Sequence, residues 1–77
     1  MMEKQIRTIL AETLGVPASE ITPEKRLIDD LGLTSFDLAD VVLQAQEEFG
    51  ITLPSSLWGE IVTVADVYRV VKEAVQP

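Results

Sequence analysis

Residues 31–50 read LGLTSFDLADVVLQAQEEFG and contain the most strongly periodic pattern in the chain. The apolar residues of this stretch recur at intervals of three and four, which is the spacing of one face of an amphipathic helix. They are Leu38, Val41, Val42, Ala45 and Phe49. Thr34 and Ser35 suit the start of a helix, and Gly50 suits a left-handed C-cap. The stretch therefore predicts a helix that begins at Thr34-Ser35 and stops at Gly50.

Two further segments, one near each end of the chain, show the same periodicity. The first has apolar positions at Ile6, Ile9, Leu10 and Leu14. It is expected to end near Gly15 and Pro17. The second follows Thr63 and has apolar positions at Val64, Val67, Tyr68, Val71, Ala74 and Val75. Asp66 lies three residues after Thr63, which predicts a capping box at the start of this last helix.

Shorter features fill the two connections between these helices. Pro lies early and Gly late in residues 54–59, which favours a short helical turn. Residues 15–34 form a long connection, in which residues 22–24 (Thr-Pro-Glu) could begin a short element. Apolar residues of this connection are expected to pin it to the core as an ordered strap. They are Ile21, Leu27, Ile28, Leu31 and Leu33.

These elements predict an all-α fold. The expected architecture is a small four-helix bundle with three longer helices, one short helix and a long loop between helices one and two. A chain of 77 residues supports one small core, so residues 1–77 are expected to form a single domain.

The composition excludes most kinds of catalysis. With no His and no Cys, the chain cannot build a Ser-His or Cys-His nucleophile pair, a thiolate or a typical zinc site. We therefore expect a protein that is not an enzyme. Charged residues interrupt residues 1–14, and no stretch has the roughly 20 apolar residues of a membrane span. We expect a cytoplasmic protein without membrane insertion, and the absence of Cys fits a reducing compartment.

The net charge of −7 is concentrated in one part of the chain. Acidic and basic residues balance in 1–28 and again in 61–77, so the whole excess lies in 29–60. The acidic residues there are Asp29, Asp30, Asp37, Asp40, Glu47, Glu48 and Glu60. A negative surface argues against nucleic acid or an anionic membrane as partner, because association would begin against phosphate repulsion. A basic protein surface is the expected partner.

On a helical wheel, most of this charge falls within a single arc of the central helix. We call this arc the acidic ridge; it consists of Asp37, Asp40, Gln44, Glu47 and Glu48. One interpretation is a solvated face that keeps a small protein soluble. The other is a docking surface for a basic partner. The uniform sign favours this second interpretation, because like charges along a helix repel each other and a basic partner would compensate for that repulsion.

A second arc beside the ridge carries Phe36, Ala39 and Leu43. The long loop or the short helix is expected to cover Ala39. Phe36 and Leu43, an apolar pair rimmed by carboxylates, are predicted to form a transient protein-docking patch.

Ser35 lies at the positive end of the acidic helix, just after Gly32. A serine there can be an ordinary N-cap, and Thr34 could equally fill that position. The chain as a whole, however, resembles the acyl carrier protein family over nearly all of its length. The resemblance rests on the segments LGV (14–16), LGL (31–33), SFD (35–37), EEFGI (47–51) and TV (63–64).

The resemblance implies that Ser35 carries a covalent 4′-phosphopantetheine, whose terminal thiol would supply the sulfur that the chain lacks. It also implies a set of positions that meet partner enzymes: Phe36, Asp37, Asp40, Leu43, Glu47 and Glu48. The family usually has Asp before the serine. Thr34 stands there in this chain, so the transferase would meet no carboxylate at that position.

The expected function is that of a monomeric acyl carrier protein. It would hold acyl or aminoacyl intermediates as thioesters, in fatty-acid-like, polyketide or other specialised biosynthesis. Its partners would be a phosphopantetheinyl transferase and acyl-loading ligases or synthases with basic docking surfaces. Trp58 lies in the short third helix, where it would be a half-buried aromatic or would narrow the cargo cleft.

Two alternatives come from the residues themselves. The acidic ridge and a capping Ser35 would also suit a helical interaction module that has no prosthetic group. A weak divalent-cation site at Asp29 and Asp30 or along the ridge has few ligands and lacks EF-hand spacing, so no metal is expected.

Overall fold

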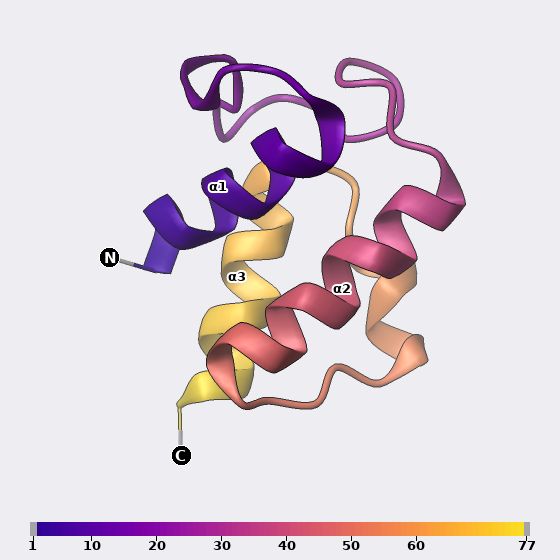
Figure 1. The fold of residues 1–77 in the computed structure, drawn as a ribbon. Coiled ribbons are helices and arrows are strands. Elements are labelled where there is room, and N and C mark those ends of the chain that lie inside the picture. Colours follow the sequence, from indigo (N-terminus) through magenta and orange to yellow (C-terminus); the bar gives the residue numbers. More distant parts are fainter. Residues whose placement is uncertain (1, 77) are drawn as a thin grey trace.

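The computed structural model describes residues 2–76, which contain three α-helices and two short 3₁₀-helices joined by loops (Figure 1). In chain order they are α1 (Met2–Leu14), η1 (Ala18–Glu20), α2 (Ser35–Phe49), η2 (Ser55–Glu60) and α3 (Val64–Val75). Within residues 2–76 there is no strand, and the β-type pairing consists of one isolated antiparallel bridge between Arg26 and Thr63. The prediction of an all-α fold with three longer helices is confirmed.

The helix ends lie where local chemistry places them. Gly15 and Gly50 follow α1 and α2 and have φ values of 70° and 63°, in the left-handed region that glycine adopts without steric cost. The N–H of Gly50 donates to the carbonyl oxygen of Gln46, which closes the last turn of α2. At the start of α3, Thr63 and Asp66 form the predicted capping box.

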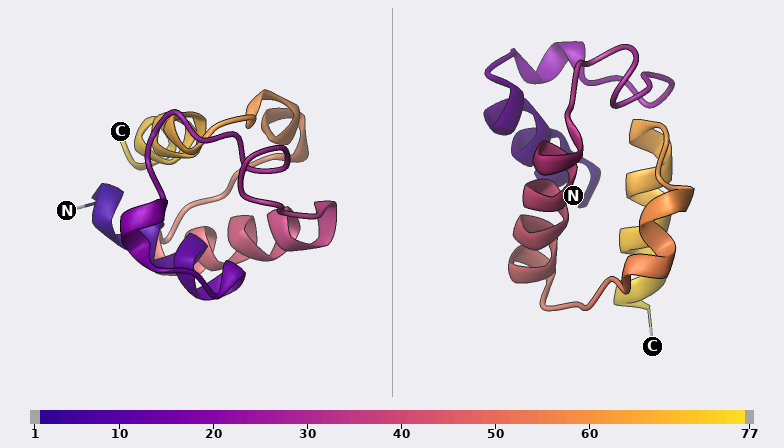
Figure 2. Two further views of the ribbon diagram at one scale, coloured as in Figure 1. Left: turned by 90° about the horizontal axis from the view of Figure 1, so that it is seen from above. Right: turned by 90° about the vertical axis from the view of Figure 1, so that its right-hand side faces the viewer.

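The core lies between the three α-helices and includes residues of the long loop. Figure 2 shows α2 and α3 on opposite sides of this core. Its most deeply buried side chains come from all three helices and the loop: Ile6, Leu10, Ile21, Leu27, Leu33, Val41, Val64, Val70 and Val71. Burial of such apolar side chains is the main stabilising term in a domain of this size.

The long loop between α1 and α2 differs from the prediction in two respects. Its short element is η1 at Ala18–Glu20, whereas residues 22–25 form a hydrogen-bonded turn, with the N–H of Lys25 donating to the carbonyl of Thr22. The prediction that Ile28 pins the loop was wrong, because its side chain is 57% exposed. The N–H of Leu33 donates to the carbonyl of Leu27, and the side chains of both residues are buried. Leu27 and Leu33 therefore anchor this part of the loop to the core, and Ile28 between them is left exposed to solvent.

Main-chain hydrogen bonds tie this loop to the start of α3. The N–H of Leu27 donates to Val62 over 2.9 Å, and the N–H of Val64 donates to Lys25 over 3.0 Å. A third bond, also 3.0 Å, runs from Ala65 to Pro23. The loop is thus a strap held across the top of the bundle, as predicted, and it fixes where α2 begins.

The short element predicted over residues 54–59 is η2, which follows Pro54 as its N-cap. Trp58 is half-buried there, and its indole N–H donates to the carbonyl of Leu53 over 3.1 Å. The N–H of Leu53 donates in turn to Gln46 Oε1 over 2.8 Å. Side chains from α2 and η2 therefore satisfy both main-chain groups of the buried Leu53.

Candidate functional site

Ser35 is the first residue of α2, and Thr34, not Ser35, caps the helix. The Thr34 hydroxyl oxygen accepts a hydrogen bond from the N–H of Asp37 over 3.1 Å. The Asp37 carboxylate accepts one from the N–H of Thr34 over 3.0 Å. Because Thr34 performs the capping role, the exposed hydroxyl of Ser35 makes no hydrogen bond within residues 2–76.

The direction in which Ser35 points is set by the residues before it. Gly32 has a φ of 77° and allows the chain to turn there. A residue with a Cβ would meet steric strain in this left-handed conformation, whereas glycine does not. Leu33 is buried, and its N–H donates to the carbonyl of Leu27 over 2.9 Å. With Leu33 in the core and Thr34 in the cap, Ser35 is held at the molecular surface.

The surroundings of Ser35 fit a phosphodiester. The N–H groups at the start of an α-helix have no partner in the helix itself, and the helix dipole favours an anion there. The N–H groups of Ser35 and Phe36 are therefore available to phosphate oxygens. The nearby carboxylate of Asp37 is already bonded to the N–H of Thr34, which draws it toward the cap.

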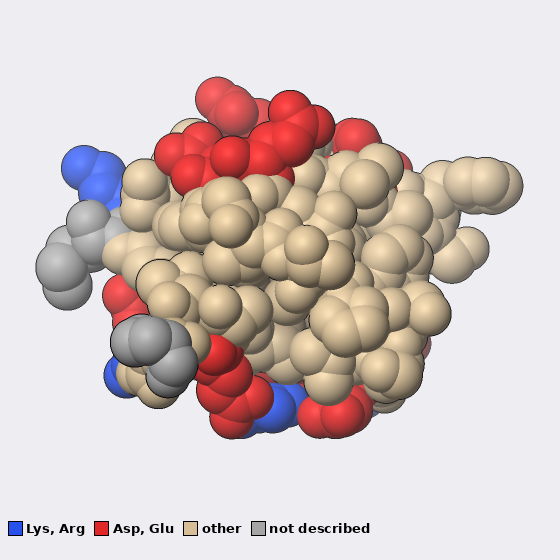
Figure 3. Space-filling model, turned by 90° about the horizontal axis from the view of Figure 1, so that it is seen from below, with Lys and Arg blue, Asp and Glu red and all other residues tan. Residues whose placement is uncertain are grey.

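The acidic ridge is present on α2 as predicted. Asp40, Glu47 and Glu48 are exposed, while Asp37 is half-buried within the capping box. Figure 3 shows acidic side chains gathered along one side of the molecule, whereas acidic and basic side chains are mixed on the opposite side. Glu48 accepts a hydrogen bond from Gln5 Nε2 over 3.2 Å, and Asp40 accepts one from Gln44 over 3.3 Å. These contacts hold the ridge carboxylates without neutralising them.

The other three acidic residues of the segment 29–60 have cationic partners, which the sequence reasoning missed. Arg26 pairs with Asp29 over 3.6 Å and with Asp30 over 3.2 Å. Arg69 on α3 pairs with Glu60 over 3.6 Å. Among the described residues no ion pair involves the four carboxylates of α2. Within residues 29–60, the carboxylates without a cationic partner are therefore fewer than predicted, and they are those of α2.

The apolar patch beside the ridge has the predicted geometry. Phe36 is 86% exposed and Leu43 is 52% exposed, while Ala39 between them is half-buried. The sequence reasoning missed Val62, which is also more than half exposed. No periodic pattern marks this residue, because it lies in the irregular segment between η2 and α3. Phe36 and Leu43 thus present apolar surface beside the ridge carboxylates, and Phe36 directly follows the exposed Ser35.

Two kinds of feature are absent from the described residues. Within residues 2–76, acidic side chains do not come together in any group of three or more that could hold a metal ion. In the same range, none of the helices is both long enough and apolar enough to cross a membrane.

The site is thus an exposed hydroxyl at the start of an acidic helix, in a chain with neither His nor Cys. Such a site suits modification by another protein, and the fold and site define a small helical carrier domain. The model of the phosphopantetheine attachment site family matches residues 4–71. The chain therefore belongs to this family, that of the acyl carrier proteins. As in that family, the chain is a non-catalytic carrier whose cofactor is 4′-phosphopantetheine.

Individual relatives agree with this assignment. An acyl carrier protein of Thermobifida fusca (strain YX) is 37% identical over 75 residues, which cover 92% of this chain and 95% of the relative. A solved structure from Mycobacterium tuberculosis, described as a candidate acyl carrier protein, superimposes with a TM-score of 0.90 at 32% identity. That match covers 95% of this chain and 97% of the other.

A more distant likeness concerns the fold alone. The apo doublet acyl carrier protein from prodigiosin biosynthesis has a TM-score of 0.82 at 23% identity. The match covers 99% of this chain and 40% of the doublet protein. The helical arrangement is therefore shared with a carrier whose sequence has diverged considerably.

Proposed function

We propose that Ser35 is the attachment residue, and that the chain holds acyl or aminoacyl groups as thioesters on a 4′-phosphopantetheine arm. The observation that carries the proposal is the exposed Ser35 hydroxyl, left unused at the start of α2 because Thr34 caps the helix. The other serines, Ser19, Ser55 and Ser56, lie in short 3₁₀-helices, where no long helix dipole favours a phosphate.

The modification requires no catalytic group from the chain beyond the Ser35 hydroxyl. The Ser35 oxygen forms an ester bond to the phosphorus of the phosphopantetheine donor, and the phosphoanhydride bond of that phosphorus breaks. The second phosphate leaves with the rest of the donor, and the hydroxyl proton passes to a base of the transferase. This division of labour agrees with a chain that has no histidine. The contribution of the chain is to present the hydroxyl and to offer the N–H groups of the first turn to the phosphate.

The proposed docking surface for partner enzymes lies along α2. It combines the apolar side chains Phe36 and Leu43 with carboxylates, namely Asp37, Asp40, Glu47 and Glu48. The expected partners are a phosphopantetheinyl transferase and acyl-loading ligases or synthases with basic surfaces, because opposite charge steers association and sets orientation. The absence of ion pairs at all four carboxylates of α2, among the described residues, supports this choice of face.

The residues around the serine favour a specialised pathway. Carriers of mainstream fatty-acid synthesis usually have Asp-Ser-Leu at this point, whereas this chain has Thr34-Ser35-Phe36. We therefore infer a dedicated acyl, aminoacyl or polyketide carrier in preference to a general fatty-acid carrier. The proposal includes a monomeric protein whose single domain spans residues 1–77. Its action in the cytoplasm stays a prediction.

The test is co-expression with a broad-specificity phosphopantetheinyl transferase, followed by intact mass spectrometry. The wild type is expected to gain the mass of one phosphopantetheine and the Ser35→Ala variant to gain nothing. Ser55→Ala is the matched control, because Ser55 is also an exposed serine at the first position of a helix, and it should be modified like the wild type. An unmodified wild type, or modification of Ser35→Ala, would refute the assignment of Ser35.

A further inference from the structure

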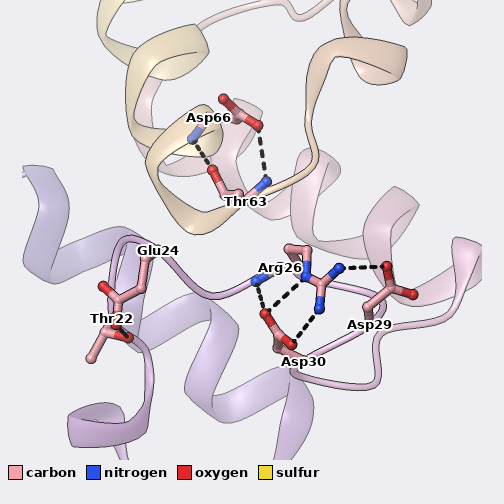
Figure 4. A network of polar contacts seen from close by, with 7 residues as sticks. All are labelled: Thr22, Glu24, Arg26, Asp29, Asp30, Thr63 and Asp66. Atoms are coloured by element: carbon pink, nitrogen blue, oxygen red, sulfur yellow. Dashed lines mark hydrogen bonds and ion pairs between the residues drawn. The ribbon is translucent and has the colours of Figure 1, made fainter.

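We propose that Asp30 and Arg26 form a clasp that positions Ser35 for the transferase, an inference that rests on the proposed attachment at Ser35. The clasp closes the turn of residues 26–33, which lies between the strap and the start of α2. It involves neither α2 nor the acidic ridge, and it is drawn in Figure 4.

The Asp30 carboxylate accepts three hydrogen bonds, all from Arg26. One comes from the main-chain N–H over 2.8 Å, and two come from the guanidinium Nε and Nη2, each over 3.2 Å. The guanidinium also lies 3.6 Å from Asp29. A planar guanidinium that binds both oxygens of one carboxylate is the most directional ion pair available to side chains. These bonds lower the pKa of the Asp30 carboxyl below its ordinary value.

Main-chain bonds wrap the turn around the same residue. The carbonyl of Arg26 accepts from the N–H groups of Asp30 and Leu31, each over 3.0 Å. Arg26 is also the residue that forms the isolated antiparallel bridge with Thr63, just before α3. One end of the turn is thus fixed to α3, and the clasp fixes the rest of the turn to that end.

The turn leads directly to the attachment serine. After Asp30, the chain reaches Ser35 through Leu31, Gly32, Leu33 and Thr34. Gly32 lacks a side chain that could restrict it and already occupies the left-handed region. Without the clasp, residues 28–32 would be held by main-chain bonds and by the packing of Leu31 against the core. Other conformations of the turn would then compete with the one that presents Ser35.

The clasp is suited to local order and contributes little to overall stability. The side chains of Arg26 and Asp30 are 55% and 32% exposed, and exposed ion pairs contribute little to the free energy of unfolding. Its loss should therefore reduce the fraction of molecules whose turn is competent for binding. A reduced competent fraction raises the apparent dissociation constant in proportion and leaves the chemical step unchanged.

The test compares variants of the full apo chain by two measurements. Heteronuclear ¹⁵N NOE values report the order of residues 27–35, and steady-state kinetics with the transferase give KM and kcat. Asp30→Ala is expected to lower the NOE values of this segment and to raise KM about fivefold, with kcat within about twofold of the wild type. Arg26→Ala should show a smaller effect of the same kind, because the main-chain N–H still reaches Asp30. Asp30→Asn should have a KM between those of Asp30→Ala and the wild type, because the amide oxygen can still accept a hydrogen bond from Arg26.

Arg69→Ala is the matched control. Arg69 is similarly exposed and pairs with three carboxylates, but it lies on α3, and none of these three carboxylates belongs to the turn of residues 26–33. Arg69→Ala should change neither the NOE values nor KM. Unaltered NOE values in Asp30→Ala, an unaltered KM, or an equal rise of KM in Arg69→Ala would each overturn the proposal. If Asp30→Ala fails to fold, Arg26→Ala and Asp30→Asn decide in its place.

The two proposals fail in different ways. Modification of Ser35→Ala would refute the attachment residue, whatever the clasp does. With a modified wild type and an unmodified Ser35→Ala, an unchanged KM in the clasp variants would refute the positioning role alone. The NOE comparison uses the apo chain, so it tests the order of the turn independently of any modification.

Discussion

The side chains and main-chain N–H groups of Thr34 and Asp37 satisfy each other reciprocally, through hydrogen bonds of 3.1 Å and 3.0 Å. Thr63 and Asp66 make the same arrangement at the start of α3. In the first case the box leaves the next residue, Ser35, with an unused hydroxyl. Capping by a neighbour is thus what makes this serine available.

The first prediction concerns this cap. Thr34→Ala should lower the free energy of unfolding by about 1 kcal/mol, because the N–H of Asp37 loses its acceptor. Thr34→Asp should stay within a few tenths of a kcal/mol of the wild type, because Asp is an equally good cap. Urea unfolding, followed by the fluorescence of Trp58, the only tryptophan, measures both.

Thr63→Ala is the matched control for the effect on Ser35. It removes the equivalent cap from α3, so it should cost a similar free energy of unfolding and leave the rate of Ser35 modification unchanged. Thr34→Ala should slow that modification as well, because the first turn of α2 frays. Equal rates for the two alanine variants would show that the cap of α2 has no special role in presenting Ser35.

Local pattern was sufficient to predict the helices. Each α-helix combines apolar residues at helical spacing with a stop or start signal close to its end, as at Gly50 and at Thr63. The identity of the α2 cap was also encoded, since Asp37 lies three residues after Thr34 and only two after Ser35. The spacing therefore matches that of Thr63 and Asp66, and this comparison would have singled out Thr34.

Irregular segments were harder to predict. In the strap no period determines which side chain faces inward, so Ile28 was assigned to the core although it is 57% exposed. The pairs of Arg26 with Asp30 and of Arg69 with Glu60 depend on a turn and on a contact between η2 and α3. Neither follows from periodicity. The sequence therefore predicted where the acidic residues lie along the chain, but not which of them pair with arginines.

The second prediction concerns the connection between α2 and η2. Leu53 is 4% exposed, and its N–H donates to Gln46 Oε1 over 2.8 Å. Gln46→Ala leaves this buried N–H without a partner and should lower the free energy of unfolding by about 1–3 kcal/mol. Gln44→Ala removes an exposed bond to Asp40 and should cost less than about 0.5 kcal/mol. Equal effects of the two substitutions would contradict the role assigned to Gln46.

The third prediction concerns acid. Hydrogen bonds from the N–H groups of Thr63 and Val62 lower the pKa of the Asp66 carboxyl below its ordinary value of 3.8. The ionised form thus stabilises the folded state fully above about pH 4, and the contribution is lost as the pH falls through the lower folded value. The free energy of unfolding of Asp66→Asn should lie below that of the wild type at pH 7 and 5. The difference should close below about pH 4.

Asp40→Asn serves as the control for that measurement. Its carboxylate accepts a single exposed bond from Gln44, so the substitution should change the free energy of unfolding by less than about 0.5 kcal/mol at pH 7. A gap between wild type and Asp66→Asn that is independent of pH would contradict the assignment, because it would then reflect packing and not ionisation.

The fourth prediction concerns the acidic ridge. Asp40→Lys and Glu47→Lys should each lower kcat/KM with the transferase roughly tenfold at low salt, because the ridge steers a basic surface toward α2. The loss should shrink at about 0.5 M salt, where charges are screened within a few ångströms. Glu20→Lys makes the same charge change on η1, away from α2, and should have little effect. Unchanged kinetics in the ridge variants would favour a solvated face that serves solubility.

The fifth prediction separates stability from docking at Phe36. Its side chain is 86% exposed, so Phe36→Ala removes almost no buried surface and should change the free energy of unfolding by less than about 0.5 kcal/mol. In contact with a partner the ring would be covered, and aromatic anchors of this kind contribute about 1–2 kcal/mol or more to binding. The expected result is therefore a roughly tenfold lower kcat/KM with the transferase at unchanged stability. Val75→Ala truncates another exposed apolar side chain, at the end of α3, and should leave the kinetics unaltered; an equal loss there would show that Phe36 is not a specific contact.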